Sequence, residues 1–140
     1  MKLTKKEKFN LAKNLDLSKQ INVVGQIIVK DIKEGITKLS KDVNDKPFAP
    51  LKSATIIKKG HSKPLLDKGK MKNIYLKEKA KKGSQKAVIS MNRRDREIPS
   101  VVHNQGLAPQ KLREWFGVSV RAVKQANKYI NLEINRLLRK

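Results

Sequence analysis

The sequence predicts an α+β fold in a single domain, and three observations carry that prediction. Residues 18–40 repeat apolar side chains at spacings of three and four, as a helix requires. Residues 74–91 contain two alternating apolar and polar segments around a glycine, which is typical of an antiparallel hairpin. Residues 119–138 return to the helical spacing. At 140 residues the chain has the length of one domain, and segregated helices and strands favour α+β.

The expected order is two N-terminal helices, the second one long, an irregular basic segment, a hairpin and a long C-terminal helix. Thr4 and Glu7 have the spacing of a capping box at the start of a short helix over 4–15. Within the single domain 1–140, residues 1–17 are predicted to form a mobile arm. Ser18 is the expected N-cap of the long helix. Its expected apolar stripe comprises Ile21, Val24, Ile28, Ile32, Ile36 and Leu39.

The middle of the chain is predicted to be irregular up to the hairpin. Two prolines mark residues 41–50 as a loop, and residues 51–60 suggest one or two helical turns ended by Gly60. Pro64 and Gly69 keep the next stretch irregular. In the hairpin, we expect Ile74 and Leu76 to lie on the same face as Ala87, Ile89 and Met91.

The last helix is the most clearly predicted element. Ser119 is its expected N-cap, with Val118 and Val123 placed as a hydrophobic staple. Its expected core stripe comprises Val123, Ala126, Ile130, Ile134 and Leu137. The adjacent Trp115 and Phe116 are expected in the core, with a contact between subunits as the alternative.

The composition points to anionic partners. The net charge is +22, and 27 of the 34 basic residues are lysines, which suit diffuse attraction better than base readout. Residues 46–86 carry 13 lysines against two acids. AT-biased codon usage explains a lysine excess about equally well. With apolar residues at 38%, the core is thin, so burial against partners would add stability.

Several classes of protein are disfavoured. The absence of cysteine excludes disulfides and thiol chemistry. No apolar run reaches the roughly 20 residues of a membrane span. The N-terminus does not resemble a secretory signal, which predicts a protein made in a cytoplasm without membrane partners.

Catalysis is also disfavoured. The run PLLDKGK resembles the end of a phosphate-binding loop, but Pro64 and Met71 stand where that loop needs glycine and serine or threonine. His61 and His103 belong to no ligand set, and Asp67 suits a turn. We therefore expect no enzyme, no cofactor and no metal. An enzyme built on Asp67 and His103 is the remote alternative.

Sequence-independent contact with nucleic acid remains open, and a solvated lysine face explains the same residues equally well. No motif for reading bases is present. The lysines expected to face DNA or a partner are Lys58, Lys59, Lys63, Lys68, Lys70, Lys72, Lys81 and Lys82.

Short motifs in the middle and near the end of the chain resemble the phage virion morphogenesis family, the tail-completion proteins of tailed phages. An aromatic precedes Pro-Leu, a Ser-x-Ala-Thr-like turn leads to a basic residue and glycine, and a Pro-Leu-hydrophobic-Asp-x-Gly run follows. A His-x-x-Gly turn and an arginine-aromatic-glycine-serine corner come before the last helix. The residues that match are Phe48, Pro50, Leu51, Ser53, Ala54, Thr55, Lys59, Gly60, Pro64, Leu65, Leu66, Asp67, Gly69, Lys70, Met71, His103, Gly106, Arg113, Trp115, Phe116, Gly117 and Ser119.

The resemblance spans roughly residues 20–138, with two departures. Lys68 stands where the family usually has threonine, and Glu114 where it often has proline. Turn geometry accounts for Pro50, Gly60, Gly69, Gly106 and Gly117, which are therefore expected to be scaffold positions.

The resemblance implies a structural protein of the virion, made in the host bacterial cytoplasm. Such proteins act in tail completion or at the head–tail junction (neck), and related ones form rings, commonly hexameric, on the tail axis. Expected partners are the chain itself, other tail and neck proteins, and genomic DNA through sequence-independent contact. In that role residues 52–86 would project from the long helices, with the Asp67–Gly69 turn setting their direction and lysines facing the lumen or an acidic ring. A small basic nucleic-acid-binding protein is the alternative.

Overall fold

The computed structural model describes residues 4, 6, 15–65, 73–91 and 113–139, and it confirms the α+β class. In chain order the elements are the helix α2 (Ser18–Glu34), the π-helical turn η1 (Gly35–Leu39), the short helix α3 (Ser53–Lys59), the strands β1 (Ile74–Glu78) and β2 (Val88–Met91), and the helix α5 (Val120–Leu138).

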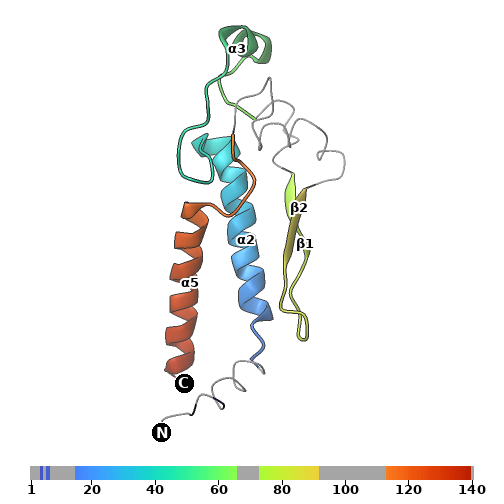
Figure 1. The fold of residues 1–140 in the computed structure, drawn as a ribbon, viewed down its shortest axis with the longest axis vertical. Helices are drawn as coiled ribbons and strands as arrows, with labels where there is room; N and C mark the ends of the chain where they lie inside the picture. The colour runs from blue at the N-terminus through green and yellow to red at the C-terminus, as the bar shows by residue number, and fades with distance from the viewer. Residues whose placement is uncertain (1–3, 5, 7–14, 66–72, 92–112, 140) are drawn as a thin grey trace.

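The helix α2 is the centre of the molecule. The helix α5 runs alongside it on one flank and the β1–β2 hairpin on the other, while α3 stands apart beyond one end (Figure 1). The expectation that residues 52–86 all project is therefore wrong for the hairpin. Its apolar residues Ile74 and Leu76 need cover, and α2 provides it: Ile74 is buried, and Leu76 packs over Gly25.

The long helix predicted over 18–40 is confirmed in extent, but its start and its last turn differ from the expectation. Ser18 is the first residue of the helix, and Leu17 rather than Ser18 occupies the N-cap position; the Ser18 backbone N–H donates to Asp16 Oδ1 at 3.0 Å. Hydrogen bonds from Ser18 lower the pKa of Asp16 below its ordinary value. The last turn widens into η1 and ends at Ser40, which has a left-handed backbone.

The predicted apolar stripe of this helix is confirmed except at its end, and its first members Ile21, Val24 and Ile28 are half-buried. Ile32 and Ile36 are buried, and Val29 joins them, whereas Leu39 at the end of the stripe is exposed. The stripe ends early because the wider π turn rotates the last residues away from the core.

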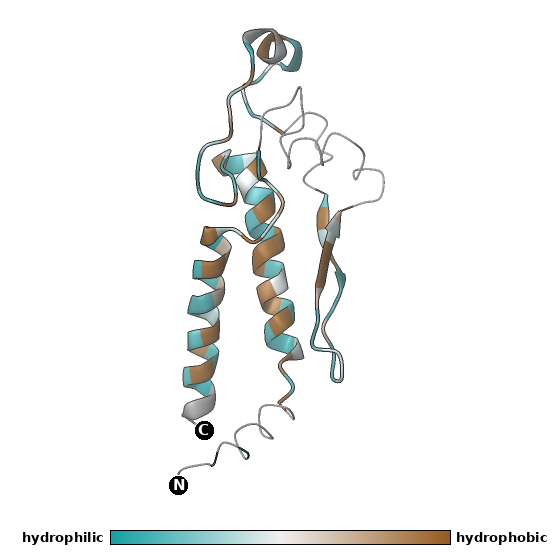
Figure 2. Ribbon diagram, in the orientation of Figure 1, coloured by the Kyte–Doolittle hydropathy of each residue, from teal (hydrophilic) through white to brown (hydrophobic). Residues whose placement is uncertain are grey.

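The hairpin has the predicted antiparallel pairing. Ile74 pairs with Met91 and Leu76 with Ile89, so the expected apolar residues share one face. The turn is closed by a bridge between Lys81 and Ser84, and Gly83 has a φ of 88°, which favours glycine. The strands carry the apolar residues, and the turn end of the hairpin is hydrophilic (Figure 2).

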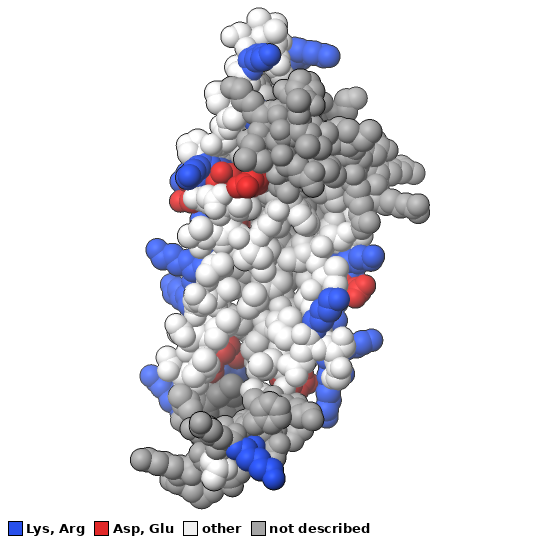
Figure 3. Space-filling model, in the orientation of Figure 1, with Lys and Arg blue, Asp and Glu red and all other residues white. Residues whose placement is uncertain are grey.

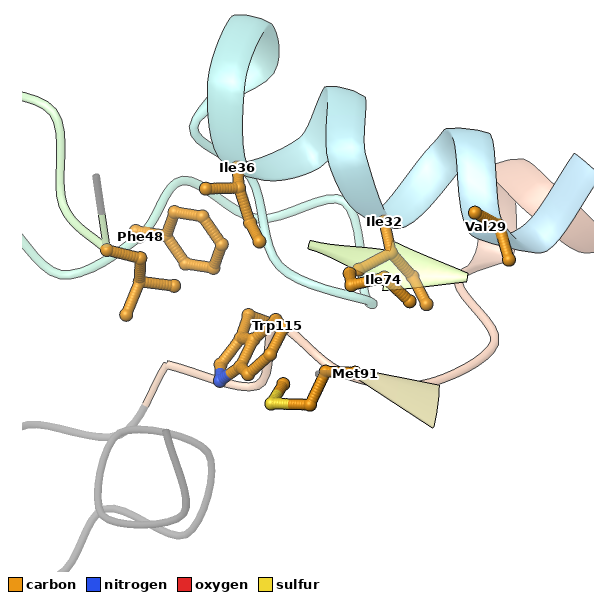
Figure 4. Packing of buried hydrophobic residues seen from close by; sticks show 8 residues of the cluster. Val29, Ile32, Ile36, Phe48, Ile74, Met91 and Trp115 are labelled. Carbon is orange, nitrogen blue, oxygen red and sulfur yellow. The ribbon is translucent and has the colours of Figure 1, made fainter. Parts of the chain in front are cut away.

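The core forms where α2, the hairpin and two loops meet. Trp115 is buried there, as predicted, while Phe116 is partly exposed and packs edge-on against it with ring centroids 5.4 Å apart. The cluster is made of Val29, Ile32, Ile36, Phe48, Leu65, Ile74, Met91 and Trp115 (Figure 4).

The C-terminal helix begins as predicted but presents a different face. Ser119 Oγ accepts a hydrogen bond from the Ala122 N–H at 2.9 Å, which confirms the cap. The expected stripe is wrong for Val123, Ile130 and Ile134, which are exposed, although Ala126 is buried. Ala122 also faces inward, because small side chains let two helices approach closely.

The expected staple at the start of α5 is not a buried contact, since Val118 and Val123 are both exposed. The first turn of α5 is instead held by polar contacts to α2, which are described below.

Several predictions fall on residues outside the described part of the chain. Most of the helix over 4–15 lies there, as do Lys68, Lys70, Lys72, Asp67, Gly69, His103 and Gly106. At the end of the predicted arm, the Leu17 N–H donates to Gln85 Oε1, and Gln85 Nε2 donates to the Leu15 carbonyl. Among the described helices, none has the length and apolar character needed to cross a membrane.

Candidate interaction surfaces

Three of the segments that carry the family resemblance meet in one place. Phe48, Leu65 and Trp115 come from separate segments of the chain and are all buried in the same cluster. Phe48 lies next to Ile36, and Trp115 lies next to Met91 (Figure 4). Three motif segments that are separate in the sequence are thus packed together, whereas the segment that forms α3 has no buried residue.

Arg113 ties this unit together. Its Nε donates to the Ala49 carbonyl at 3.0 Å, and its Nη2 reaches the Pro50 carbonyl at 3.4 Å. The side chain is buried, and this burial lowers the pKa of the guanidinium below its ordinary value. A buried arginine that binds two carbonyls fixes the position of a loop, because its planar donors match that geometry.

The remaining described motif residues occupy turns and edges. Gly60 ends α3 with a φ of 74°, so its expected role in turn geometry is confirmed. Pro64 is buried, Leu51 and Gly117 are half-buried, and Pro50 and Thr55 are exposed. A Cβ at position 117 would lie 3.4 Å from Val43 Cγ1, so the corner passes close to the loop.

The described candidate lysines do not form one patch. Lys58, Lys59 and Lys63 belong to α3 and the segment after it, whereas Lys81 and Lys82 lie in the hairpin turn at the opposite end of the molecule (Figure 1). Two of them have hydrogen-bond partners within the chain: Lys63 Nζ donates to the Thr37 carbonyl at 2.9 Å, and Lys59 Nζ to the Lys63 carbonyl. The hairpin turn and Lys58 are therefore the better candidates for contact with an external anion.

A buried polar corner joins α2 to α5. Asp31 is 4% exposed and accepts hydrogen bonds from Ser119 Oγ and from Arg121 Nε, the latter at 3.0 Å. Arg121 Nη1 also donates to Asp45 Oδ1 and to the Asp42 carbonyl, both at 2.9 Å. Burial works against the charge of Arg121, but its hydrogen bonds with Asp45 and Asp31 raise its pKa above the ordinary value.

The polar corner is complete and sterically tight. In the described part of the chain, every buried side-chain nitrogen or oxygen has a hydrogen-bond partner. A Cβ at Gly35 would lie 3.1 Å from Arg121 Nη2 and 3.2 Å from the Lys41 carbonyl, so only glycine lets Arg121 pass without displacing its neighbours. A polar network in which every group has a partner fixes the orientation of two helices and offers no unpaired group to a ligand.

Sequence reasoning missed this polar corner, although two signals were present. Asp31 follows Ile28 by three residues, which places a carboxylate on the apolar side of the long helix. Arg121 lies in the first turn of α5, where the helix dipole disfavours a cation. Each residue is unfavourable alone, and together they indicate a buried pair.

A row of exposed apolar side chains runs along α5. Val120, Val123, Ile130 and Ile134 are 61%, 45%, 39% and 47% exposed. Lysines and arginines lie mainly along the flanks and at the ends of the molecule, and the middle of the viewed face is uncharged (Figure 3). Exposed apolar side chains that follow one another along a helix, on a chain with a thin core, are typical of an interaction surface.

The described residues contain no group of three or more histidine, aspartate or glutamate side chains placed to hold a metal ion. His61 Nδ1 accepts a hydrogen bond from the Lys63 N–H at 3.3 Å, which is the local backbone contact expected for a loop histidine. Asp67 and His103, on which the enzyme alternative depends, lie outside the described residues.

Comparison with known proteins returns no match: no family model, no curated protein and no solved structure is similar to this chain.

Proposed function

We propose that this chain is a structural protein of a tailed phage particle, acting in tail completion or at the head–tail junction as a homo-oligomer around the tail axis. The observation that carries the proposal is the packing of Phe48, Leu65 and Trp115 in one cluster, with Arg113 bound to the loop after Phe48. Large apolar residues commonly share a core, whereas the bonds from Arg113 to the Ala49 and Pro50 carbonyls join two of the motif segments directly. Pieces that share a core behave as one structural unit.

The surface supports an assembly role. The apolar row on α5 is large for a chain with few apolar residues, and burying it against other subunits would add stability. The exposed lysines at the hairpin turn suit acidic neighbours or the DNA that passes through a tail channel.

The test uses the phage whose genome encodes the chain. We expect the protein in purified virions by mass spectrometry, and we expect a stop codon in its gene to yield heads and tails that fail to join. Supplying the wild-type chain from a plasmid should restore infectivity and controls for effects on neighbouring genes. Full infectivity without the gene, or absence of the chain from purified virions, would refute the proposal.

The second candidate is sequence-independent nucleic-acid binding, and the exposed lysines of the hairpin favour it. Lys81 and Lys82 lie in its turn, and the strands and their flanks add Lys77, Lys79 and Lys86. Affinity for short duplex DNA should then fall steeply with salt, with a log–log slope of about 0.9 per contacted phosphate. The double change Lys81→Gln/Lys82→Gln should lower that slope, whereas Lys58→Gln at the other end should not. A salt-independent affinity would exclude this candidate.

A further inference from the structure

The exposed apolar row of α5 follows a heptad spacing. Val120, Val123, Asn127, Ile130 and Ile134 succeed one another at intervals of three and four residues. These intervals place Val120, Asn127 and Ile134 at a positions and Val123 and Ile130 at d positions of a coiled-coil seam. All five side chains are exposed.

This seam is not the face that α5 uses within its own fold. The buried residues of the helix are Ala122 and Ala126, which occupy c and g positions. The helix thus turns its alanines inward and its larger branched side chains outward. An amphipathic helix in a monomer normally does the reverse, since the large side chains gain most from burial.

The charges around the seam indicate what covers it. Among the a, d, e and g positions from Val120 to Leu138, Lys124 is the one basic residue and Glu133 the one acid. Arg121, Lys128 and Arg136 occupy b and c positions, away from the seam. In a chain with a net charge of +22, a face so poor in cations is suited to another copy of the same chain, because like charges stay apart. DNA or an acidic protein would gain little from it.

Asn127 adds a second argument for self-pairing. A single asparagine at an a position, flanked by aliphatic layers, sets register and strand number in parallel coiled coils, because the two amides bind each other. Against an unrelated apolar partner, the same side chain would be buried without a hydrogen-bond partner. The asparagine therefore favours a second α5 aligned in parallel and in register.

We propose that α5 is a self-association face, on which two copies of this chain pair in parallel through Val120, Val123, Asn127, Ile130 and Ile134. The helix has 19 residues, so the seam is about 28 Å long. The pairing is a two-fold contact that closes on itself, so it gives a dimer and is a different contact from the one that would join subunits into a ring around the tail axis. It is measured on the purified chain alone, so either proposal can fail without the other.

The first experiment is sedimentation velocity of the full chain over a range of concentrations at moderate salt. We expect a concentration-dependent mass above the 16.0 kDa of one chain. Ile134→Lys should weaken association by about tenfold or more, because a charge would be buried in the seam. Leu132→Lys is the matched control: Leu132 is 61% exposed, lies two residues away at an f position, and should leave association unchanged.

Circular dichroism of both variants checks the fold, which should be intact because both side chains are exposed in the single chain. Equal effects of the two substitutions, or a monomer at every concentration, would overturn the proposal. A monomer that instead captures a different protein through this face would overturn it too.

The second experiment tests register and uses the absence of cysteine from the chain. Asn127→Cys should form an intermolecular disulfide on mild oxidation, because parallel pairing brings the same position of two copies face to face. Gln125→Cys, at an exposed f position, is the matched control and should cross-link slowly. Equal cross-linking at both positions would overturn the in-register pairing.

Discussion

Asp31→Asn is expected to destabilise the fold by about 3 kcal/mol, the lower part of the range for removing one partner of a buried ion pair. Asp31 is 4% exposed and receives hydrogen bonds from Arg121 and from Ser119 Oγ. Asparagine has nearly the same shape as aspartate, but its amide NH₂ replaces one carboxylate oxygen. That NH₂ would face a hydrogen-bond donor, either Arg121 or the Ser119 hydroxyl. Arg121 retains its contact with Asp45 at 2.9 Å, so the loss should stay below the upper end of the range.

Asp45→Asn is the matched control for this prediction. It makes the same chemical change to the same arginine, but the Asp45 side chain is 44% exposed, so solvent screens its charge. Asparagine also tolerates the left-handed backbone of this position, where φ is 64°. Its effect should be a small fraction of that of Asp31→Asn.

The assay is equilibrium unfolding in urea at neutral pH, with the free energy extrapolated to water. Asp31→Asn should lower the midpoint without changing the slope, since the surface exposed on unfolding is unaltered. Equal losses in the two variants, or no loss in Asp31→Asn, would refute the view that the buried carboxylate orients α5 on α2.

Three further predictions concern the hairpin and the loop. Asn22→Ala should cost about 2 kcal/mol in urea unfolding, because the Asn22 side chain binds both the N–H and the carbonyl of the buried Ala80, at 2.7 and 2.9 Å. Gly25→Ala should change stability by less than about 1 kcal/mol, because the added Cβ would lie 2.8 Å from Leu76 Cδ1, the mobile end of a side chain, and alanine is favoured over glycine inside a helix by about 1 kcal/mol; the double change with Leu76→Ala should remove part of the strain. Hydrogen bonds from Arg121 and Lys41 lower the pKa of Asp45 below its ordinary value of 3.8. The Asp45 carboxylate therefore stabilises the fold at pH values above 3.8, and this contribution is lost as the pH falls below that value. The difference in unfolding midpoint between wild type and Asp45→Asn should accordingly shrink at acid pH.

Each of these predictions has a contradicting outcome. An unaltered unfolding midpoint in Asn22→Ala would mean that water replaces the two hydrogen bonds between the Asn22 side chain and the Ala80 backbone. Strict additivity of Gly25→Ala and Leu76→Ala would show that the two positions are not in contact. A midpoint difference between wild type and Asp45→Asn that grows in acid would contradict the lowered pKa of Asp45.

The local pattern of the sequence was sufficient for the elements themselves. Spacings of three and four over residues 18–40, alternation on either side of Gly83 and the Ser119 cap each depend on contacts within a few residues of the chain. Such contacts recur wherever the same residues occur, so the α2 helix, the antiparallel hairpin and the start of α5 were predicted correctly, whereas the register that pairs Ile74 with Met91 was not predicted.

The tertiary structure alone decided which faces meet. The periodicity of α5 offers two faces, one of large aliphatic residues and one of alanines, and size alone favours the first. Arg121 reaches Asp31 only when the alanine face turns toward α2, and that requirement joins residues 90 positions apart. The sequence by itself determined the elements and the charge of this protein. The rotation of α5, and with it the exposed seam, follows from long-range contacts that no local pattern encodes.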